Sequence, residues 1–368
     1  MSTKHLILLG IRGIPAQHGG FETFAEHLCL TLIMHDWDIT VYCQEEGTGS
    51  LYESEWEGIK RIHIPIKNTG PLGTIIFDLK AVLHSLRFNG VFLTLGYNTA
   101  IFNALHCLKG KKNIINMDGI EWKRQKWGLV AKTWFCLNER LGCWFGSHLV
   151  ADHPRIKDHL ATRGVSRDKI TMIPYGGREI TNADEQLLVE YGLEKDNYAI
   201  FIARAEPENS VLEMVTAFSA KTRDTKLVVL GNFEPKRKPY HKAVIEAASA
   251  EVVFLGAIYE TDKVSALRFF CRFYVHGHQV GGTNPSLVEA LGSGDAILAH
   301  DNPFNRWVAK DGALYFSDLA SMERGYDQLF TDDALIESLR AKSKENFHAN
   351  FQWADIIEQY EQLLLKFL

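Results

Sequence analysis

Short runs of apolar residues alternate along the chain with longer stretches in which apolar residues recur at helical spacing. Runs of four to eight residues bounded by Gly or Asp are typical of strands that are buried on both faces of a parallel sheet. The stretches between them predict the helices that cover such a sheet. The first series of predicted strands comprises residues 5–10, 38–43, 90–96, 113–119, 148–152 and 169–176.

A second series follows a polar connector at residues 181–197. Two series predict an α/β protein with two doubly wound Rossmann-like domains, at residues 1–180 and 181–350, that face each other across a cleft. The last segment, 351–368, has helical spacing and is expected to pack back towards the first domain. The second series of predicted strands comprises residues 198–205, 226–231, 252–257, 272–278, 296–300 and 313–316.

Composition narrows the class of protein. Of 368 residues, 46% are apolar and 23% are charged, which is typical of globular domains. The net charge of −5 and the lack of a basic half argue against a nucleic-acid partner. The first apolar run is too short for a secretory signal, and no run approaches a membrane span. Six scattered cysteines without a CxxC pair indicate reduced thiols, so we expect a cytoplasmic protein.

A loop with several glycines follows the first predicted strand. Gly19 and Gly20 immediately precede a predicted helix, and Arg12 and His18 lie in the same loop. Glycines let a phosphate or a sugar approach the backbone, and a helix N-terminus offers N–H donors. The spacing is not GxGxxG, which argues against a dinucleotide oxidoreductase. The alternative is a plain glycine turn.

Segment 276–294 contains the most informative motif. Asn284 and Pro285 are suited to cap and begin a helix, and Gly281, Gly282 and Thr283 would present backbone amides to an anion there. Ser286 lies in the first turn of that helix. Glu289 lies one turn further on, between apolar neighbours, which favours a partly buried, paired acid over a solvated one.

Arg204 ends the first predicted strand of the second series. From there its guanidinium could grip phosphate oxygens and offset the charge of a leaving diphosphate. The alternative is an ion pair with Glu206 or Glu208. The basic run at 235–242 is interpreted as a solvated loop rather than a phosphate contact.

Asp118 lies at the end of another predicted strand, where it could contact a donor or acceptor hydroxyl or simply cap a helix. The next residues, 122–135, interleave tryptophans with Lys and Arg. Such a stretch either rests on an anionic membrane surface or packs against the core, and both alternatives stay open. Asp36, Trp37 and Asp38 spell a two-carboxylate metal pattern, but they precede a strand, so we expect a surface turn and no metal.

The chain as a whole resembles the retaining glycosyltransferases of family 4, and within them the bacterial rhamnosyltransferase branch. The resemblance implies two facing Rossmann-like domains of the GT-B type. The motifs that carry it are GIRGIPAQHGGFET (10–23), MDGIEWKRQKWG (117–128), IPYGG (173–177), RAEPENS (204–210), HGHQVGGTNPSLVEALGSG (276–294) and DNPFNRWV (301–308).

The resemblance also implies roles for individual residues. Gly19 and Gly20 would line the donor phosphates or the acceptor, Arg204 would stabilise the leaving diphosphate, and Glu289 would bind the nucleotide ribose. Asn209 stands where most relatives have a lysine, and Gly281 stands where most have a glutamate. The missing glutamate favours a 6-deoxy sugar on dTDP over glucose- or mannose-type donors.

The expected protein is therefore a metal-independent rhamnosyltransferase of surface polysaccharide synthesis. It would need no cofactor besides its co-substrate, dTDP-rhamnose. Its acceptor would be a saccharide or a lipid-diphosphate-linked saccharide, with peripheral contact at the inner face of the membrane. The alternatives are a transferase that uses another UDP- or GDP-sugar, a nucleotide-sugar epimerase, and a non-catalytic binding protein.

Overall fold

The structure is a computed structural model that describes residues 4–17, 19–67 and 70–368. These residues form two compact units. The first comprises the residues up to Lys123, Trp127–Tyr175 and Trp353–Leu368, and the second comprises Arg124–Lys126 and Gly176–Gln352.

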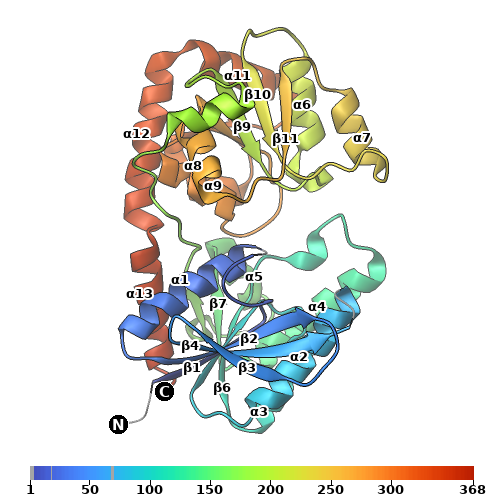
Figure 1. The fold of residues 1–368 in the computed structure, drawn as a ribbon, viewed down its shortest axis with the longest axis vertical. Helices are drawn as coiled ribbons and strands as arrows, with labels where there is room; N and C mark the ends of the chain where they lie inside the picture. The colour runs from blue at the N-terminus through green and yellow to red at the C-terminus, as the bar shows by residue number, and fades with distance from the viewer. Residues whose placement is uncertain (1–3, 18, 68–69) are drawn as a thin grey trace. The chain divides into compact units, whose positions relative to one another are not determined.

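The first unit is built on one sheet with the order β3-β4-β2-β1-β5-β6-β7-β8 (Figure 1). All neighbouring strands pair in parallel except β3 and β4. The order turns from descending to ascending between β1 and β5, as in doubly wound folds. The strands are β1 His5–Leu9, β2 Asp38–Glu46, β3 Tyr52–Trp56, β4 Ile59–Ile66, β5 Val91–Leu95, β6 Lys112–Asn116, β7 His148–Ala151 and β8 Ile170–Met172.

The β3–β4 hairpin was not expected from the sequence. β3 reads YESEW and lies mostly exposed at the sheet edge, so it lacks the apolar run that predicts a buried strand. Its turn residues Glu57 and Gly58 both have positive φ, at 48° and 76°, as in the tight turns that join twisted antiparallel strands.

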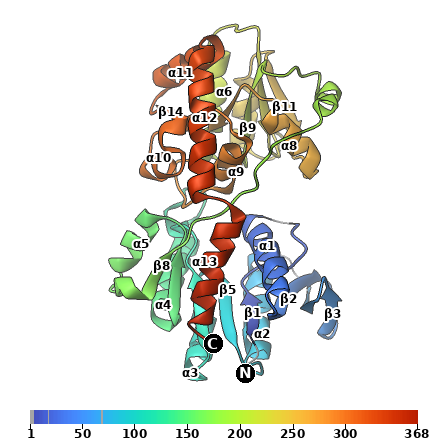
Figure 2. The ribbon, with the colours of Figure 1, turned by 90° about the vertical axis from the view of Figure 1, so that its left-hand side faces the viewer.

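Helices cover both faces of this sheet. α1 and α13 lie side by side over one face (Figure 2). There the tilted rings of Phe24 and Tyr360 lie 4.6 Å apart in the same apolar cluster as Leu6 and Leu8. α2 and α3 cover the other face, where Phe77 packs against Ile7. The helices are α1 Gly20–Met34, α2 Pro71–Ser85, α3 Asn103–Leu108, α4 Leu129–Phe145, α5 Pro154–Ala161 and α13 Trp353–Leu365.

The second unit is built on a fully parallel sheet with the order β11-β10-β9-β12-β13-β14. Its strands are β9 Tyr198–Ile202, β10 Lys226–Leu230, β11 Val252–Gly256, β12 Phe273–His276, β13 Ile297–His300 and β14 Ala313–Phe316. Its helices are α6 Val211–Ser219, α7 Pro239–Glu246, α8 Thr261–Phe269, α9 Pro285–Ser293, α10 Pro303–Ala309, α11 Leu319–Thr331 and α12 Asp333–Asn350.

Two apolar clusters lie on the two faces of this sheet, because successive residues of β9 point to opposite sides. Tyr198 and Ile200 pack towards α8 and α9, whereas Ala199 and Phe201 pack towards α6 and α11. The prediction of two α/β domains with parallel sheets is confirmed.

The chain passes between the units at Tyr175–Gly176 and again at Gln352–Trp353. The expected boundary at residue 180 therefore lies inside the second unit. The reason is local bonding: the Gly177 N–H donates to the Phe351 carbonyl at 2.8 Å, and the Ile180 N–H donates to the Gly292 carbonyl at 2.9 Å.

Helix α13 completes the core of the first unit with its buried face, formed by Ile356, Ile357, Tyr360, Leu363 and Leu364. The Asn116 amide donates to the Tyr360 hydroxyl at 2.8 Å. Within the described residues, no helix has both the length and the apolar content needed to cross a membrane.

Replacement of Ile356 by Ala should lower the free energy of unfolding of the first unit by about 2–5 kcal/mol, because it opens a cavity in a closed core. Glu358→Ala, on the exposed side of the same helix, should change it by less than about 0.5 kcal/mol. Tryptophan fluorescence during urea unfolding measures this unit, since seven of the eight tryptophans belong to it. Equal effects of the two substitutions would contradict this packing.

Candidate functional site

Two loops emerge where the strand order of the second sheet reverses, because β9 and β12 are neighbours. Ligands of doubly wound sheets bind at the carboxyl ends of the strands at this point. The β9 loop is residues 203–210, and the β12 loop is residues 277–284. The β9 loop contains Arg204 and Asn209, and the β12 loop contains Gly281, Gly282 and Thr283.

Hydrogen bonds and a close backbone approach hold the two loops together. The Ser210 hydroxyl donates to the Gly277 carbonyl at 2.8 Å, and the Gln279 N–H donates to the Glu208 carbonyl at 2.9 Å. A Cβ atom on Gly277 would lie 2.2 Å from the Asn209 carbonyl oxygen, so this approach requires glycine. The two loops therefore form one rigid platform.

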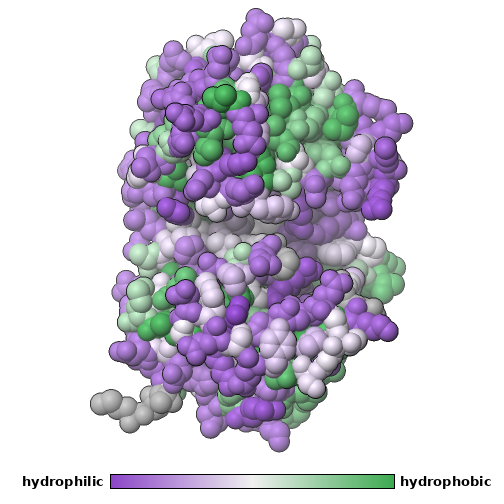
Figure 3. Space-filling model, in the orientation of Figure 1, coloured by the Kyte–Doolittle hydropathy of each residue, from purple (hydrophilic) through white to green (hydrophobic). Residues whose placement is uncertain are grey.

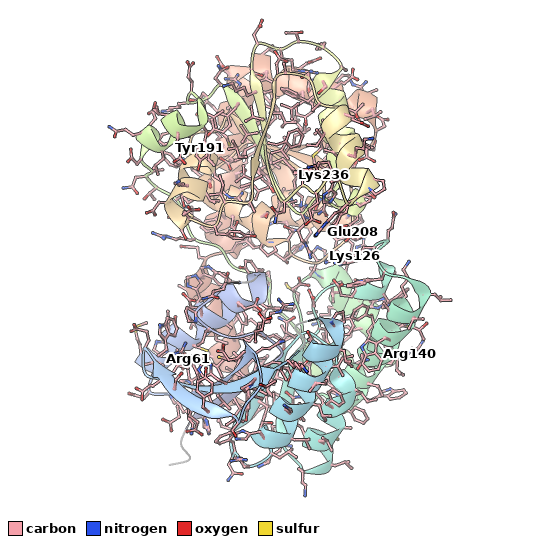
Figure 4. All side chains as sticks on the ribbon, turned by 45° about the vertical axis from the view of Figure 1, so that its right-hand side comes forward. Arg61, Lys126, Arg140, Tyr191, Glu208 and Lys236 are labelled. Carbon is pink, nitrogen blue, oxygen red and sulfur yellow. The ribbon has the colours of Figure 1, made fainter. Side chains whose placement is uncertain are left out.

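Arg204 is exposed on this platform, just beyond the end of β9. The expected alternative, an ion pair with Glu206 or Glu208, is absent among the described residues. Glu208 is buried and accepts instead from Arg124 Nη1 at 3.0 Å (Figure 4). The Asn209 amide donates to the Arg204 carbonyl at 2.8 Å, so Asn209 shapes the loop that carries the guanidinium.

The N-terminus of α9 continues from the β12 loop. Asn284 caps the helix by accepting from the Ser286 N–H at 3.0 Å, and Pro285 is its first residue. Gly281 has φ 148°, and no atom lies within 4 Å of where its Cβ would be. Open space in front of glycine backbone and a helix N-terminus is the arrangement that receives anions.

Glu289 is fixed by an arginine that sequence reasoning missed. Arg268, on α8, is almost fully buried and donates from Nη2 to Glu289 Oε2 at 2.8 Å and from Nη1 to the Ser286 carbonyl at 3.2 Å. Burial lowers the pKa of Arg268, but the nearby carboxylates of Glu289 and Asp295 outweigh it and raise that pKa. The Glu289 side chain stays 43% exposed, so its second oxygen can accept from a ligand hydroxyl.

Two stacked histidines line the end of β12. The rings of His276 and His278 lie 4.4 Å apart and nearly parallel. Burial, followed by the positive charges of Arg124 and Arg204, lowers the pKa of His278 to about 3. His278 is therefore neutral at physiological pH, and its Nδ1 has no hydrogen-bond partner among the described residues.

The loop after β13 supports the β12 loop from its other side. The side-chain amides of Asn302 and Asn305 each donate to the His278 carbonyl at 2.9 Å. Asn302 also caps α10 by accepting from the N–H groups of Phe304 and Asn305. This bonding explains the DNPF part of the motif at 301–308.

In the first unit, Gly19 is the N-cap of α1 and Gly20 is its first residue. Two carboxylates of that helix hold the preceding loop: Glu22 Oε1 accepts from the Arg12 N–H at 3.2 Å, and Glu26 Oε2 accepts from the Ala16 N–H at 2.6 Å. A carboxylate in the first turn suits hydroxyl groups of a sugar better than phosphate oxygens. His18, which we expected in the same loop, lies outside the described residues.

Asp118 follows β6 and is half-buried, with φ 50°. Its N–H donates to Asn116 Oδ1 at 2.9 Å, which holds the backbone in this left-handed conformation. Non-glycine residues in such conformations are concentrated at functional sites.

The aromatic stretch after Asp118 is largely tied to its own unit. The indole N–H of Trp122 donates to Glu139 at 2.8 Å, that of Trp127 to Glu121 at 3.1 Å, and that of Trp134 to the Asn98 carbonyl at 2.8 Å. These three tryptophans therefore pack against protein groups.

Two other sequence features are surface structures. Trp37 is buried and donates to Glu361 Oε1 at 2.9 Å. Asp36 lies in the turn before β2 and Asp38 is the first residue of β2, and both are exposed. The basic run at 235–242 precedes and begins α7, with Lys236 exposed (Figure 4).

Family comparisons agree with this division of the chain. Residues 184–346 match the family "Glycosyl transferases group 1". This match lies within the second unit, which is therefore similar to a glycosyl transferases group 1 domain. Residues 3–178 match a "Domain of unknown function" (DUF1972). No curated protein matches the chain by sequence.

Several solved structures have the same fold, at low sequence identity. Sucrose-phosphate synthase from Thermosynechococcus elongatus has a TM-score of 0.81 and 16% identity, over 99% of this chain and 98% of that one. Anabaena HepE in complex with UDP and glucose has a TM-score of 0.78 and 14% identity, over 98% of this chain and 99% of that one. A trehalose-phosphate synthase from Burkholderia xenovorans in complex with glucose-6-phosphate has a TM-score of 0.75 and 9% identity, over 99% of this chain and 100% of that one.

Most of the residues singled out from the sequence lie in the second unit, in or directly after the loops at the carboxyl ends of β9 and β12. Their roles stay predictions. These residues are Arg204, Asn209, Gly281, Gly282, Thr283, Asn284, Ser286 and Glu289. Gly19, Gly20 and Asp118 follow strands of the first unit. The only sequence signal for Arg268 was a charged residue within the apolar stretch ALRFF.

Replacement of Glu289 by Ala should lower the free energy of unfolding of the second unit by about 1–3 kcal/mol, because buried Arg268 loses its acceptor. Glu345→Ala, an exposed position on α12, is the matched control and should have almost no effect. Urea unfolding followed by hydrogen exchange measures this unit separately. If Glu289→Ala behaves like the control, Arg268 does not depend on Glu289.

Proposed function

We propose that the protein is a retaining glycosyltransferase that moves rhamnose from dTDP-rhamnose to a saccharide or a lipid-linked saccharide. The observation that carries the proposal is the platform at the switch point of the second unit. It combines an arginine that no described carboxylate neutralises with an open glycine backbone and a helix N-terminus.

The parts of this platform suit the parts of a nucleotide-diphosphate sugar. Arg204 and the amides at the start of α9 would bind the diphosphate. Glu289, aligned by Arg268, would accept hydrogen bonds from the ribose hydroxyls. The neutral ring of His278 would face the donor without adding charge.

Gly281 supports a donor other than a glucose- or mannose-type sugar. Its φ of 148° is a conformation that side-chain-bearing residues rarely adopt. The glutamate common among similar enzymes at this position would have a strained backbone here. The loop conformation therefore requires glycine, and the change is more than the loss of a carboxylate. A sugar without a 6-hydroxyl presents one hydroxyl fewer to be bound.

The proposed acceptor contact is Asp118, whose carboxylate would accept from the attacking hydroxyl or orient it. A lipid-diphosphate-linked acceptor would place the enzyme at the cytoplasmic side of the inner membrane, as a peripheral protein in polysaccharide synthesis.

The proposed reaction keeps the anomeric configuration. The acceptor hydroxyl attacks the anomeric carbon on the face that the diphosphate leaves, and the departing phosphate oxygen takes the hydroxyl proton. No protein nucleophile is required, so the enzyme contributes electrostatic stabilisation of the departing diphosphate by Arg204 and the α9 N-terminus. Neither a metal nor a redox cofactor enters this scheme.

A thermal-shift panel of dTDP-, UDP- and GDP-sugars tests the donor. A ligand present at 100 times its Kd stabilises the protein by about 2.7 kcal/mol, which is readily measured. The proposal requires the largest shift from dTDP-rhamnose. A larger shift from a UDP-sugar would favour the second candidate donor, since Anabaena HepE was solved with UDP and glucose.

Incubation with the preferred donor separates transfer from its alternatives. Formation of an epimer without any acceptor would identify an epimerase. Binding without turnover on any saccharide or lipid-linked acceptor would identify a binding protein. NMR of the product must show the anomeric configuration of the donor.

Arg204→Ala should lower kcat about 10²- to 10³-fold while the fold persists, because a preorganised partner of the developing charge is removed. Arg237→Ala, an exposed arginine in the basic run, is the matched control and should retain wild-type turnover. Initial rates of nucleotide release measure both variants. Wild-type turnover in Arg204→Ala would refute the assignment.

A further inference from the structure

We propose that the outer side of helices α2, α3 and α4 docks onto an anionic lipid bilayer. This surface, the α2–α4 face, carries exposed apolar side chains at Leu72, Leu83, Leu108, Val130, Leu137 and Trp144. The proposal deepens the proposed function by naming the surface that would meet a lipid-linked acceptor, but it does not depend on the reaction.

The apolar side chains on α4 form a stripe on its outer side. Val130, Leu137 and Trp144 are spaced seven residues apart, which places them above one another on one side of a helix. Their exposures are 86%, 45% and 64%. The opposite side of α4 is buried, and there Gly142 lies against Met117 and Ala100. The buried side of α4 also holds the polar residues Asn138 and Glu139, so the apolar stripe lies on the side that does not pack against the protein.

Helix α2 repeats this arrangement. Leu72, Ile76 and Leu83 are exposed at spacings of four and seven residues, while Phe77 and Ala81 pack into the core. Helix α3 packs between α2 and α4 and ends at Leu108, which is 81% exposed. The apolar side chains thus extend over three neighbouring helices, and those at the start of α4 show at the edge of the first unit (Figure 3).

The exposed charges on this part of the chain are basic. Residues 71–145 contain ten Lys and Arg, of which Arg124 and Lys126 belong to the second unit, and four Asp and Glu, in a chain whose net charge is −5. Three of the four acids are buried, and the fourth, Asp118, is half-buried. Lys80, Lys109 and Arg140 are exposed beside the apolar stripes, and Arg140 lies at the outer edge of α4 (Figure 4).

This combination fits an anionic bilayer better than a second protein. Apolar side chains would enter the boundary between headgroups and acyl chains, while the basic side chains would contact lipid phosphates. Trp144 is of the residue type that favours this boundary. Two copies of the α2–α4 face would instead bring like charges together, and lysine is depleted from protein interfaces. With no spanning helix among the described residues, contact would be confined to the bilayer surface.

Co-sedimentation of the whole protein with vesicles tests the proposal. Vesicles that contain phosphatidylglycerol should bind the protein, and vesicles of pure phosphatidylcholine should bind it at least about tenfold more weakly. Val130→Glu and Trp144→Glu should each lower binding about tenfold or more, because each removes an apolar anchor. Arg140→Glu should lower binding at low salt, with a smaller effect at high salt.

Val189→Glu is the matched control, since Val189 is 76% exposed on the second unit. It should bind vesicles like the wild type. Failure of the wild type to bind, or an equal loss in Val189→Glu, would overturn the proposal. So would a dimer of the wild type that Trp144→Glu dissociates in sedimentation equilibrium, which would assign the face to a second copy. Unchanged nucleotide-sugar thermal shifts in Val130→Glu and Trp144→Glu establish that both fold, and they separate this test from that of the donor.

Discussion

The close approach of the β9 and β12 loops at Gly277 is the constraint on which the candidate site depends. With no side chain at Gly277, the Asn209 carbonyl comes close enough for Ser210 to bond across the gap. That contact joins the loop that carries Arg204 to the loop that leads into α9. The strand order alone would bring the two loops near each other, but it would not bring their backbones within hydrogen-bonding distance. The proposed binding of a diphosphate by the platform therefore depends on backbone packing as well as on charge.

Much of the fold followed from one physical regularity, that strands buried on both faces are continuous apolar runs. Every expected strand is present, with ends shifted by a few residues. The β3–β4 hairpin was not predicted, because an exposed edge strand needs no apolar run. Its turn also has Glu57 at a positive-φ position, where Asn or Asp would have indicated a hairpin. The helix at Pro285 was predictable because capping chemistry is local: Asn284 needs only the residues that follow it.

Long-range partners were the part that could not be predicted. Glu289 was expected to be paired, because its neighbours are apolar, yet nothing in the sequence indicated that its partner is Arg268 on a different helix. From the sequence, Asn209 was interpreted only as the absence of a lysine that most relatives have. In the structure its side-chain amide donates to the Arg204 carbonyl. The tryptophans after Asp118 illustrate the same limit. Their spacing allowed either burial or exposure, and the choice depends on acceptors such as Glu139 and Asn98.

The path of the chain has a consequence for how the molecule is made. The first unit is begun before residue 175 but receives helix α13 only after the whole of the second unit has been synthesised. On the ribosome, the sheet of the first unit must therefore wait with the α13 side of its core, near Phe24, open to solvent. The second unit has no such wait, since its last helix, α12, comes before α13. The core of the first unit is therefore completed only when helix α13 is added.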